Sequence, residues 1–94
     1  MPSSQKLGIF ARIGVFHSTC IPLADEASVL GKVKEEMQEF LDEPSTEEAA
    51  DVIITLLLWC DLQGDDLHHA INRKMDENER RTWALQEDGT YHHV

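Results

Sequence analysis

Hydrophobic positions recur with a helical period over about residues 25–41. Val29, Val33 and Phe40 fall on one arc of a helical wheel, and Glu36 lies inside that arc. Lys32 and Glu39 lie on the border of this arc, and Glu35 points further away, toward solvent. The pattern therefore predicts a helix with one acidic residue on its apolar side.

The next helix is predicted over about residues 46–62, after Pro44 and with Gly64 as its stop. Ser45 or Thr46 can cap it, and the glutamates that follow favour the positive end of the helix dipole. Residues 49–60 are almost entirely apolar, which is typical of a helix buried on all sides. We therefore expect this helix at the centre of the fold, with Asp51 inside the protein.

A third helix is predicted to begin near Asp65 or Asp66 and to continue to about Trp83. Its inward stripe starts with apolar side chains and continues with polar ones, in the order Leu67, Ala70, Ile71, Lys74, Asn78 and Arg81. Polar residues on a line that faces the core predict a polar cavity at that end of the helix.

The two ends of the chain give weaker patterns. In the N-terminal segment, residues 1–23, "IFARIGVF" fits a short helix or extended chain, and "FHSTCIPLADEAS" is interpreted as a loop. The C-terminal tail, residues 84–94, contains a predicted turn at Asp88-Gly89 and no other clear signal.

The length of 94 residues fits a single domain, 1–94, with a limited core. Together with the helical periods it predicts an all-α bundle of three main helices. Small chains often complete their core by association, so we expect a homo-oligomer, either a dimer or a dimer-of-dimers tetramer.

The formal net charge of −10 argues against binding to nucleic acid or to an anionic membrane, because both need clustered Lys and Arg. The apolar run 52–60 is far shorter than the roughly 20 residues of a membrane span. No signal peptide is recognisable, and two cysteines without a CxxC pair suit a reducing compartment. We expect a soluble cytoplasmic protein.

Two acidic pairs carry the candidate chemistry: Glu36-x-x-Glu39 on the first helix and Glu48-x-x-Asp51 on the second. Residues three apart have Cβ atoms about 5–6 Å from each other on one helix face. If the two helices pack antiparallel, the four carboxylates converge at the edge of an apolar core. Buried carboxylates must be protonated, paired with cations or bound to metal.

Few basic residues are available to neutralise these pairs, chiefly Lys32 and Lys34. Ligation by oxygen atoms alone suits hard divalent ions, and Mg²⁺ bridges carboxylates and phosphates, so the sequence predicts an Mg²⁺ site, with Mn²⁺ as the alternative. Other acidic residues of this region are interpreted as solvated surface: Glu35, Asp42, Glu43 and Glu47.

Downstream, Lys74 and Arg81 are donors suited to phosphate oxygens, and Asn78 can orient phosphate or metal-bound water. The alternative is an ordinary charged helix end, where basic residues complement the dipole. Their alignment with the apolar stripe favours the phosphate-binding interpretation.

Taken together, "KEEMQEF", "STEEAADVIITLLLWCDLQG" and "HHAINRKMDENERRTW" resemble the MazG-like all-α nucleoside triphosphate pyrophosphohydrolases, over residues 17–83. The family pattern is ExxE, then ExxD, then Lys-x-x-x-Asn-x-x-Arg, and the short single-domain members are most similar. The connection between the acidic pairs is shorter here than in long MazG proteins.

The resemblance implies Mg²⁺ held by Glu36, Glu39, Glu48 and Asp51. It also implies hydrolysis of a (deoxy)nucleoside triphosphate to a monophosphate and pyrophosphate, in nucleotide-pool house-cleaning. Glu36 is the expected general base, with Glu39 as the alternative.

The expected substrate-binding residues come from four parts of the chain. Lys74 and Arg81 would hold the outer phosphates, and Asn78 would lie beside them. The base would contact the N-terminal segment and the end of the third helix. The remaining members of this set are Phe16, His17, Lys32 and Trp83.

Two other functions are compatible with the pattern. A di-iron or di-manganese bundle uses Glu-x-x-His motifs, which Asp65-x-x-His68 and Asp66-x-x-His69 imitate. However, aspartate directly after Gly64 is a normal helix cap. The second alternative is a non-catalytic helical oligomerisation or regulatory module, in which the acidic cluster would be a docking surface.

Overall fold

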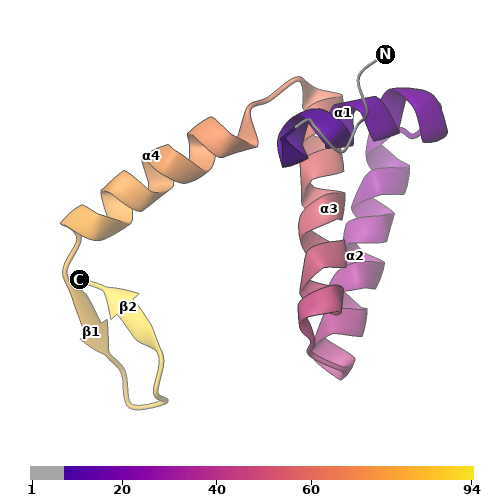
Figure 1. The fold of residues 1–94 in the computed structure, drawn as a ribbon. Coiled ribbons are helices and arrows are strands. Elements are labelled where there is room, and N and C mark those ends of the chain that lie inside the picture. Colours follow the sequence, from indigo (N-terminus) through magenta and orange to yellow (C-terminus); the bar gives the residue numbers. More distant parts are fainter. Residues whose placement is uncertain (1–7) are drawn as a thin grey trace.

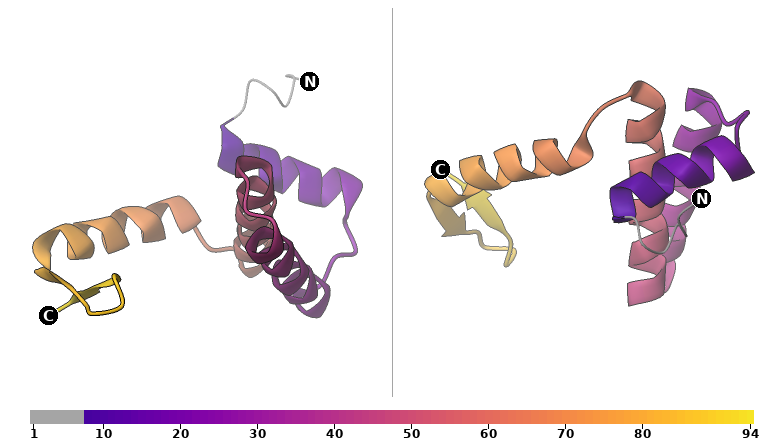
Figure 2. Two further views of the ribbon diagram at one scale, coloured as in Figure 1. Left: turned by 90° about the horizontal axis from the view of Figure 1, so that it is seen from below. Right: turned by 45° about the horizontal axis from the view of Figure 1, so that its top comes forward.

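The computed structural model describes residues 8–94, which form an open arch with principal extents of 51 × 30 × 24 Å (Figure 1). In chain order the elements are α1 (Ile9–Cys20), α2 (Glu26–Asp42), α3 (Thr46–Gln63), α4 (Leu67–Arg80), β1 (Trp83–Leu85) and β2 (Tyr91–His93). One arm of the arch is the antiparallel pair α2 and α3, and α1 lies across the end of that pair (Figure 2). The other arm is α4 with the hairpin.

Capping residues set the limits of α2 and α3, much as the sequence predicts. The Asp25 carboxylate accepts a hydrogen bond of 2.8 Å from the Ser28 N–H, and Ser28 Oγ accepts one of 3.1 Å from the Asp25 N–H. Ser45 Oγ accepts a hydrogen bond from the Glu48 N–H at the start of α3, 3.1 Å long. Gly64 ends α3 in the left-handed conformation, with φ of 72°.

The core is small and lies between α2 and α3. Its buried side chains are Val29, Glu36, Val52, Thr55, Leu57 and Leu58. Thr55 satisfies its hydroxyl by donating a 2.8 Å hydrogen bond to the Val52 carbonyl. The helical phase predicted for α2, with Val29 and Glu36 inward, is confirmed.

The expectation that α3 is buried on all sides is wrong for the single chain. Ile53, Ile54 and Leu56 are 55%, 40% and 39% exposed. Within residues 8–94, α2 covers one flank of α3 and α1 covers one end, so the remaining flank faces the inside of the arch. The described part of the chain therefore covers only part of the apolar surface of α3.

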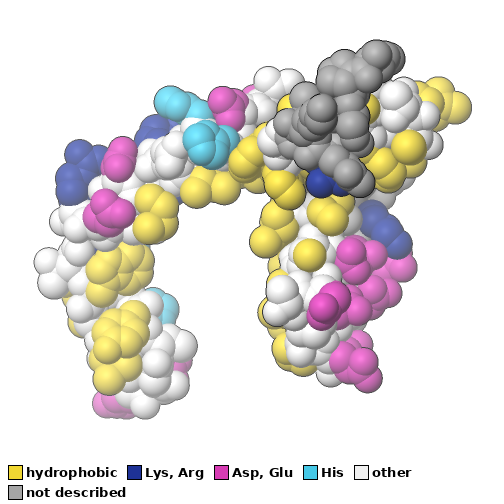
Figure 3. Space-filling view, viewed as in Figure 1, with side chains coloured by type: hydrophobic (Ala, Val, Ile, Leu, Met, Phe, Trp, Pro, Cys, Tyr) yellow, Lys and Arg dark blue, Asp and Glu magenta, His cyan; other side chains and the backbone are white. Residues whose placement is uncertain are grey.

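The inward stripe predicted for α4 does not face a core within this chain. None of the residues of α4 is buried, and Ile71 and Met75 are each 47% exposed. A short connection after Gly64 turns the chain away from α2 and α3, so α4 begins a separate arm (Figure 1). Hydrophobic side chains gather along the inner side of both arms (Figure 3).

The chain ends also differ from the expectations. α1 continues through "FHSTC", which was predicted as a loop, and Pro22 follows its end. α4 ends at Arg80 instead of near Trp83, and Trp83 begins a two-stranded antiparallel hairpin that pairs Trp83 with His93 and Leu85 with Tyr91. The turn predicted at Asp88-Gly89 is confirmed, with φ of 86° at Gly89.

Residues 1–7 of the predicted N-terminal segment lie outside the described residues. Over residues 8–94, no helix combines the length and hydropathy that a membrane crossing requires.

Candidate functional site

Three carboxylates meet where the second half of α2 faces the start of α3. Glu36 and Glu39 of α2 and Glu48 of α3 each place one oxygen within 4.8 Å of the others. Glu36 is buried, Glu48 is half-buried and Glu39 is exposed, so the group spans the distance from core to surface. We call these three residues the acidic cluster.

Local structure explains how the cluster forms. Glu36 and Glu39 are three residues apart on α2 and therefore share a helix face. Glu48 lies in the first turn of α3, where its backbone N–H is bound by Ser45 and its side chain can reach toward α2. The short connection through Pro44 makes the helices antiparallel, which brings this first turn beside the end of α2.

One basic residue partly balances the cluster. Lys32 Nζ lies 3.2 Å from Glu36 Oε1 and 3.4 Å from Glu35 Oε1. Its hydrogen bond to Glu36, followed by that to Glu35, raises the pKa of Lys32 above its usual value. Lys32 is itself half exposed, so it reaches only the outer oxygen of the buried carboxylate.

The inner oxygens of the cluster have no partner among the described residues. Glu36 Oε2 and Glu48 Oε2 are both shielded from solvent and make no hydrogen bond within residues 8–94. The hydrogen bond and charge of Glu36, followed by partial burial and the charge of Glu48, raise the pKa of Glu39. Shielded, unpaired oxygens beside mutually repelling carboxylates fit a divalent cation bound by oxygen ligands.

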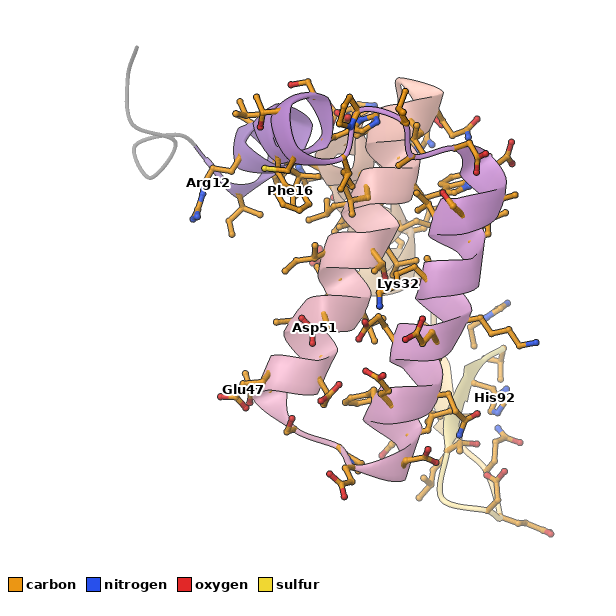
Figure 4. The ribbon with its side chains drawn as sticks, turned by 90° about the vertical axis from the view of Figure 1, so that its right-hand side faces the viewer. Arg12, Phe16, Lys32, Glu47, Asp51 and His92 are labelled. Atoms are coloured by element: carbon orange, nitrogen blue, oxygen red, sulfur yellow. The ribbon has the colours of Figure 1, made fainter. Side chains whose placement is uncertain are left out.

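Asp51, the fourth predicted ligand, is placed differently from the expectation. It is exposed on α3 and lies outside the group whose oxygens approach within 4.8 Å, so the prediction of a buried Asp51 is wrong. Asp51 still lines the same cavity as Glu36 and Lys32, and the latter is on the neighbouring helix (Figure 4).

A largely apolar cavity of about 420 Å³ adjoins the cluster. α2 and α3 form most of its wall, and Phe16 of α1 closes one side. Lys32, Glu36 and Asp51 supply its charged groups. Its size and its few polar groups are typical of a small-molecule site.

Of the two N-terminal residues predicted to contact the base, only Phe16 lines this cavity. His17 is not among the lining residues, because its Nδ1 is hydrogen bonded to Asp61 Oδ2 of α3 at 2.7 Å. No sequence signal marks this pair, since the two residues are far apart in the chain and lie on elements whose packing the hydrophobic pattern does not specify.

The predicted residues of the third helix lie on the other arm of the arch. Lys74 Nζ and Arg81 Nη2 are 3.6 Å and 3.8 Å from Glu77 Oε2, and Trp83 Nε1 donates a 2.8 Å hydrogen bond to the Asn78 carbonyl. None of these residues lines the cavity beside the acidic cluster. One chain alone does not bring them to the carboxylates.

Sequence reasoning missed several cavity residues, including Ser28, Ile54 and Thr55. Thr55 had a signal, because it is one of only two polar residues in the apolar stretch 49–60. Ile54 had no such signal, since an apolar residue in an apolar helix is predicted to belong to the core.

Comparisons with known proteins were made by family model, by sequence and by structure. No protein family model matches the chain. A dATP/dGTP diphosphohydrolase of Salmonella phage PMBT28 is 47% identical over 66 residues, which is 67% of this chain. That alignment spans 22% of the relative, so the chain covers about a fifth of its length.

A solved structure is similar over the whole chain. It is the cyanophage S-2L MazG-like pyrophosphohydrolase bound to dGDP and three catalytic Mn²⁺ ions per active site. The TM-score is 0.71 and the identity 26%, and the match covers 100% of this chain and 99% of the other. The predicted all-α fold is therefore confirmed, with a fourth helix and a small hairpin added.

Proposed function

We propose that this chain, a MazG-like all-α protein, is a divalent-cation-dependent pyrophosphohydrolase that cleaves (deoxy)nucleoside triphosphates to monophosphates and pyrophosphate. The acidic cluster beside an apolar cavity carries the proposal. The names of the two similar proteins support it, because both are hydrolases of nucleotide anhydrides. Removal of unwanted nucleotides from the pool is the role that suits this activity.

Glu36, Glu39 and Glu48 would hold Mg²⁺ or Mn²⁺, and the adjoining Asp51 would complete the ligand set. The bound ions would neutralise phosphate charge and lower the pKa of a coordinated water. The unpaired Oε2 atoms of Glu36 and Glu48 fit this role, since a cation would satisfy oxygens that no described group satisfies.

Glu39 is the better candidate for the proton acceptor. Glu36 is buried and paired through Oε1 with Lys32, whereas Glu39 lies at the exposed side of the cluster. A carboxylate at the exposed side of the cluster is open to a reacting water, as a general base must be. The structure thus favours Glu39, the alternative in the sequence-based prediction, over Glu36.

The cavity would take the nucleoside. Phe16 offers an aromatic side chain to the base, and the apolar wall excludes water from the bound ring. Lys32, at the junction of cavity and cluster, would contact a phosphate when the substrate is bound. Base and phosphates would then extend from the cavity toward the carboxylates.

A second copy of the chain would complete the site. Four of the eight Lys and Arg residues belong to α4 and its last cap: Arg73, Lys74, Arg80 and Arg81. The acidic side chains visible in Figure 3 gather mainly on the α2 and α3 arm. Association that places α4 of one copy beside the acidic arm of another would bring Lys74, Asn78 and Arg81 to the phosphates and cover both apolar inner faces. We therefore propose a dimer, or a tetramer built from dimers, acting in the cytoplasm without nucleic acid or membrane.

The structure gives the residues of the di-iron alternative other roles. Asp66 caps α4 by accepting a 3.1 Å hydrogen bond from the His69 N–H, and the His68 ring packs edge-on against Phe10, with centroids 5.4 Å apart. Thermal stability with and without divalent ions distinguishes the non-catalytic alternative from the enzyme. The non-catalytic module predicts no effect of Mg²⁺ or Mn²⁺, whereas the enzyme predicts a rise in stability.

The test is a panel of standard and damaged (deoxy)nucleoside triphosphates with Mg²⁺, in which pyrophosphate and orthophosphate release are both measured. We expect pyrophosphate as the first product, with Glu39→Gln inactive under the same conditions. Orthophosphate as the first product, or equal turnover by Glu39→Gln, would contradict the proposal.

A further inference from the structure

We propose that Asp61 of α3 is a positioning residue that holds α1, and with it Phe16, against the nucleoside cavity. This inference rests on the proposed function, and it assigns a role in substrate binding to a residue that does not line the cavity.

One carboxylate oxygen of Asp61 is bonded to α1, and the other lies close to its backbone. Oδ2 is hydrogen bonded to His17 Nδ1 at 2.7 Å, and the side chains of His17 and Asp61 are 18% and 36% exposed. Oδ1 faces Gly14, where an added Cβ would lie only 3.2 Å away. Gly14 and His17 are three residues apart and therefore share the face of α1 that meets α3. The absence of a side chain at Gly14 lets the helix approach this carboxylate.

Few other polar contacts hold α1 in place. The bond between His17 and Asp61 is the only hydrogen bond joining side chains of two different helices in the part of the chain that the structure describes. No residue of α1 is fully buried, and Phe16 is 43% exposed. A helix with so little buried surface depends on such a contact for its position.

Phe16 directly precedes His17, so movement of α1 moves the aromatic wall of the cavity. Phe16 lines this cavity together with Ile54 of α3. Glu48 and Asp61 lie near opposite ends of α3, thirteen positions or about 20 Å apart along the helix. Loss of the Asp61 contact should therefore weaken nucleoside binding and leave the acidic cluster intact.

The experiment compares Asp61→Ala, His17→Ala and Gly14→Ala with the wild-type chain. We expect KM for the nucleotide to rise about fivefold or more in each, with kcat within about twofold, because binding of the base is lost and the reacting groups are unchanged. Asp61→Asn, which keeps an acceptor for His17, should restore most of the affinity. Ser18→Ala is the matched control, since its hydroxyl bonds only to the Val15 carbonyl of the same helix.

A second measurement does not depend on turnover. With 4-fluorophenylalanine at position 16, the ¹⁹F resonance should shift in Asp61→Ala and stay unchanged in Ser18→Ala. The double variant of His17 and Asp61 should shift the ¹⁹F resonance no further than either single variant, because both substitutions remove the same hydrogen bond.

The outcomes separate this inference from the proposed function. A wild-type chain that hydrolyses no nucleotide refutes the proposed function, and the ¹⁹F shift then still decides whether Asp61 positions Phe16. Normal wild-type turnover with unchanged KM in Asp61→Ala and His17→Ala, or an unchanged ¹⁹F resonance, refutes the positioning role alone. A fall in kcat at constant KM would refute it as well.

Discussion

Glu36 is a buried carboxylate, 8% exposed, that satisfies only one of its two oxygens within residues 8–94. An isolated buried charge of this kind is costly, and a nearby lysine compensates one side of it. The other oxygen, Oε2, has no partner among the described residues, so the contacts within residues 8–94 do not explain why a carboxylate occupies this position. Cation binding gives the carboxylate a role at this position.

Replacement of the cluster carboxylates tests this at the residue scale. Glu36→Gln and Glu39→Gln should each lower kcat by about 10² or more, since an amide cannot replace a charged ligand or a proton acceptor. Steady-state kinetics with Mg²⁺ measures the loss. Glu35→Gln is the matched control: it is exposed on the same helix and also contacts Lys32, and it should keep most of the activity. An equal fall in kcat in all three variants would show that the active site is not at the acidic cluster.

The raised pKa of Glu39 predicts a pH dependence with a definite sign. In the native chain without divalent ions, Glu36 and Glu48 oppose ionisation of Glu39, so the folded state binds a proton more readily than the unfolded state does. This contribution to the free energy of unfolding is fully present below the pKa of an unfolded glutamate and is lost as the pH rises through the raised pKa of the folded state. Thermal melts across this pH range should show that loss in wild type, and Glu39→Gln should remove it.

Saturating Mg²⁺ should reverse the trend, because the cation favours the ionised cluster and its affinity falls as protons compete at lower pH. A pH profile that is the same with and without Mg²⁺ would show that the cluster does not bind the ion.

Helical periodicity was sufficient to place Glu36 inward and Glu35 outward on α2. It failed for Asp51. The apolar neighbours of Asp51 in the sequence indicate that α3 is covered, but they do not show which element covers it. The pairing of His17 with Asp61 was beyond prediction, since it depends on how α1 packs across α3.

At the scale of elements, local chemistry decides where helices begin and end. The stop of α3 is Gly64, whose left-handed φ of 72° is strained for any residue with a Cβ. Gly64→Ala should lower the free energy of unfolding by about 1 kcal/mol, which corresponds to a fall in Tm of about 4–8 °C for a domain of this size. Differential scanning calorimetry measures it.

Gly31 supplies the matched control for that substitution. It lies within α2, and an added Cβ would meet nothing within 4 Å, so Gly31→Ala should raise Tm slightly. A Tm that falls equally in both variants would show that the effect at Gly64 does not come from its backbone conformation.

The caps at Ser45 and Gly64 could be predicted because they depend on neighbours within three residues. The hairpin could not, since its strands have three residues each and no alternating apolar pattern marks them. The sequence pattern marks Ile71 as part of the apolar start of a stripe on α4, and Met75, which is as exposed as Ile71, was not assigned to it. The partner that this stripe faces was wrongly assumed to be the core of the same chain.

At the scale of the whole molecule, two arms expose apolar faces toward the inside of one arch (Figure 3). Such surfaces usually mark an interface. Ile71→Glu should therefore lower the oligomeric state or the affinity of association, and sedimentation velocity over a range of protein concentrations measures this. Activity should fall in parallel, because Lys74 and Arg81 would no longer reach a neighbouring acidic cluster.

Asn72→Glu is the control for Ile71→Glu, since it adds the same charge to the same helix away from the apolar stripe. Unchanged sedimentation in Ile71→Glu would remove α4 from the interface. Association that persists while activity is lost would instead separate assembly from completion of the site.

The most direct test of the acidic cluster is titration with Mn²⁺, followed by the electron paramagnetic resonance signal of the free ion. The wild-type chain and Glu35→Gln should take up Mn²⁺ saturably and with similar affinity. Glu36→Gln and Glu48→Gln should bind it at least tenfold more weakly. Equal affinity in all four proteins would show that Glu36 and Glu48 do not hold a shared divalent ion.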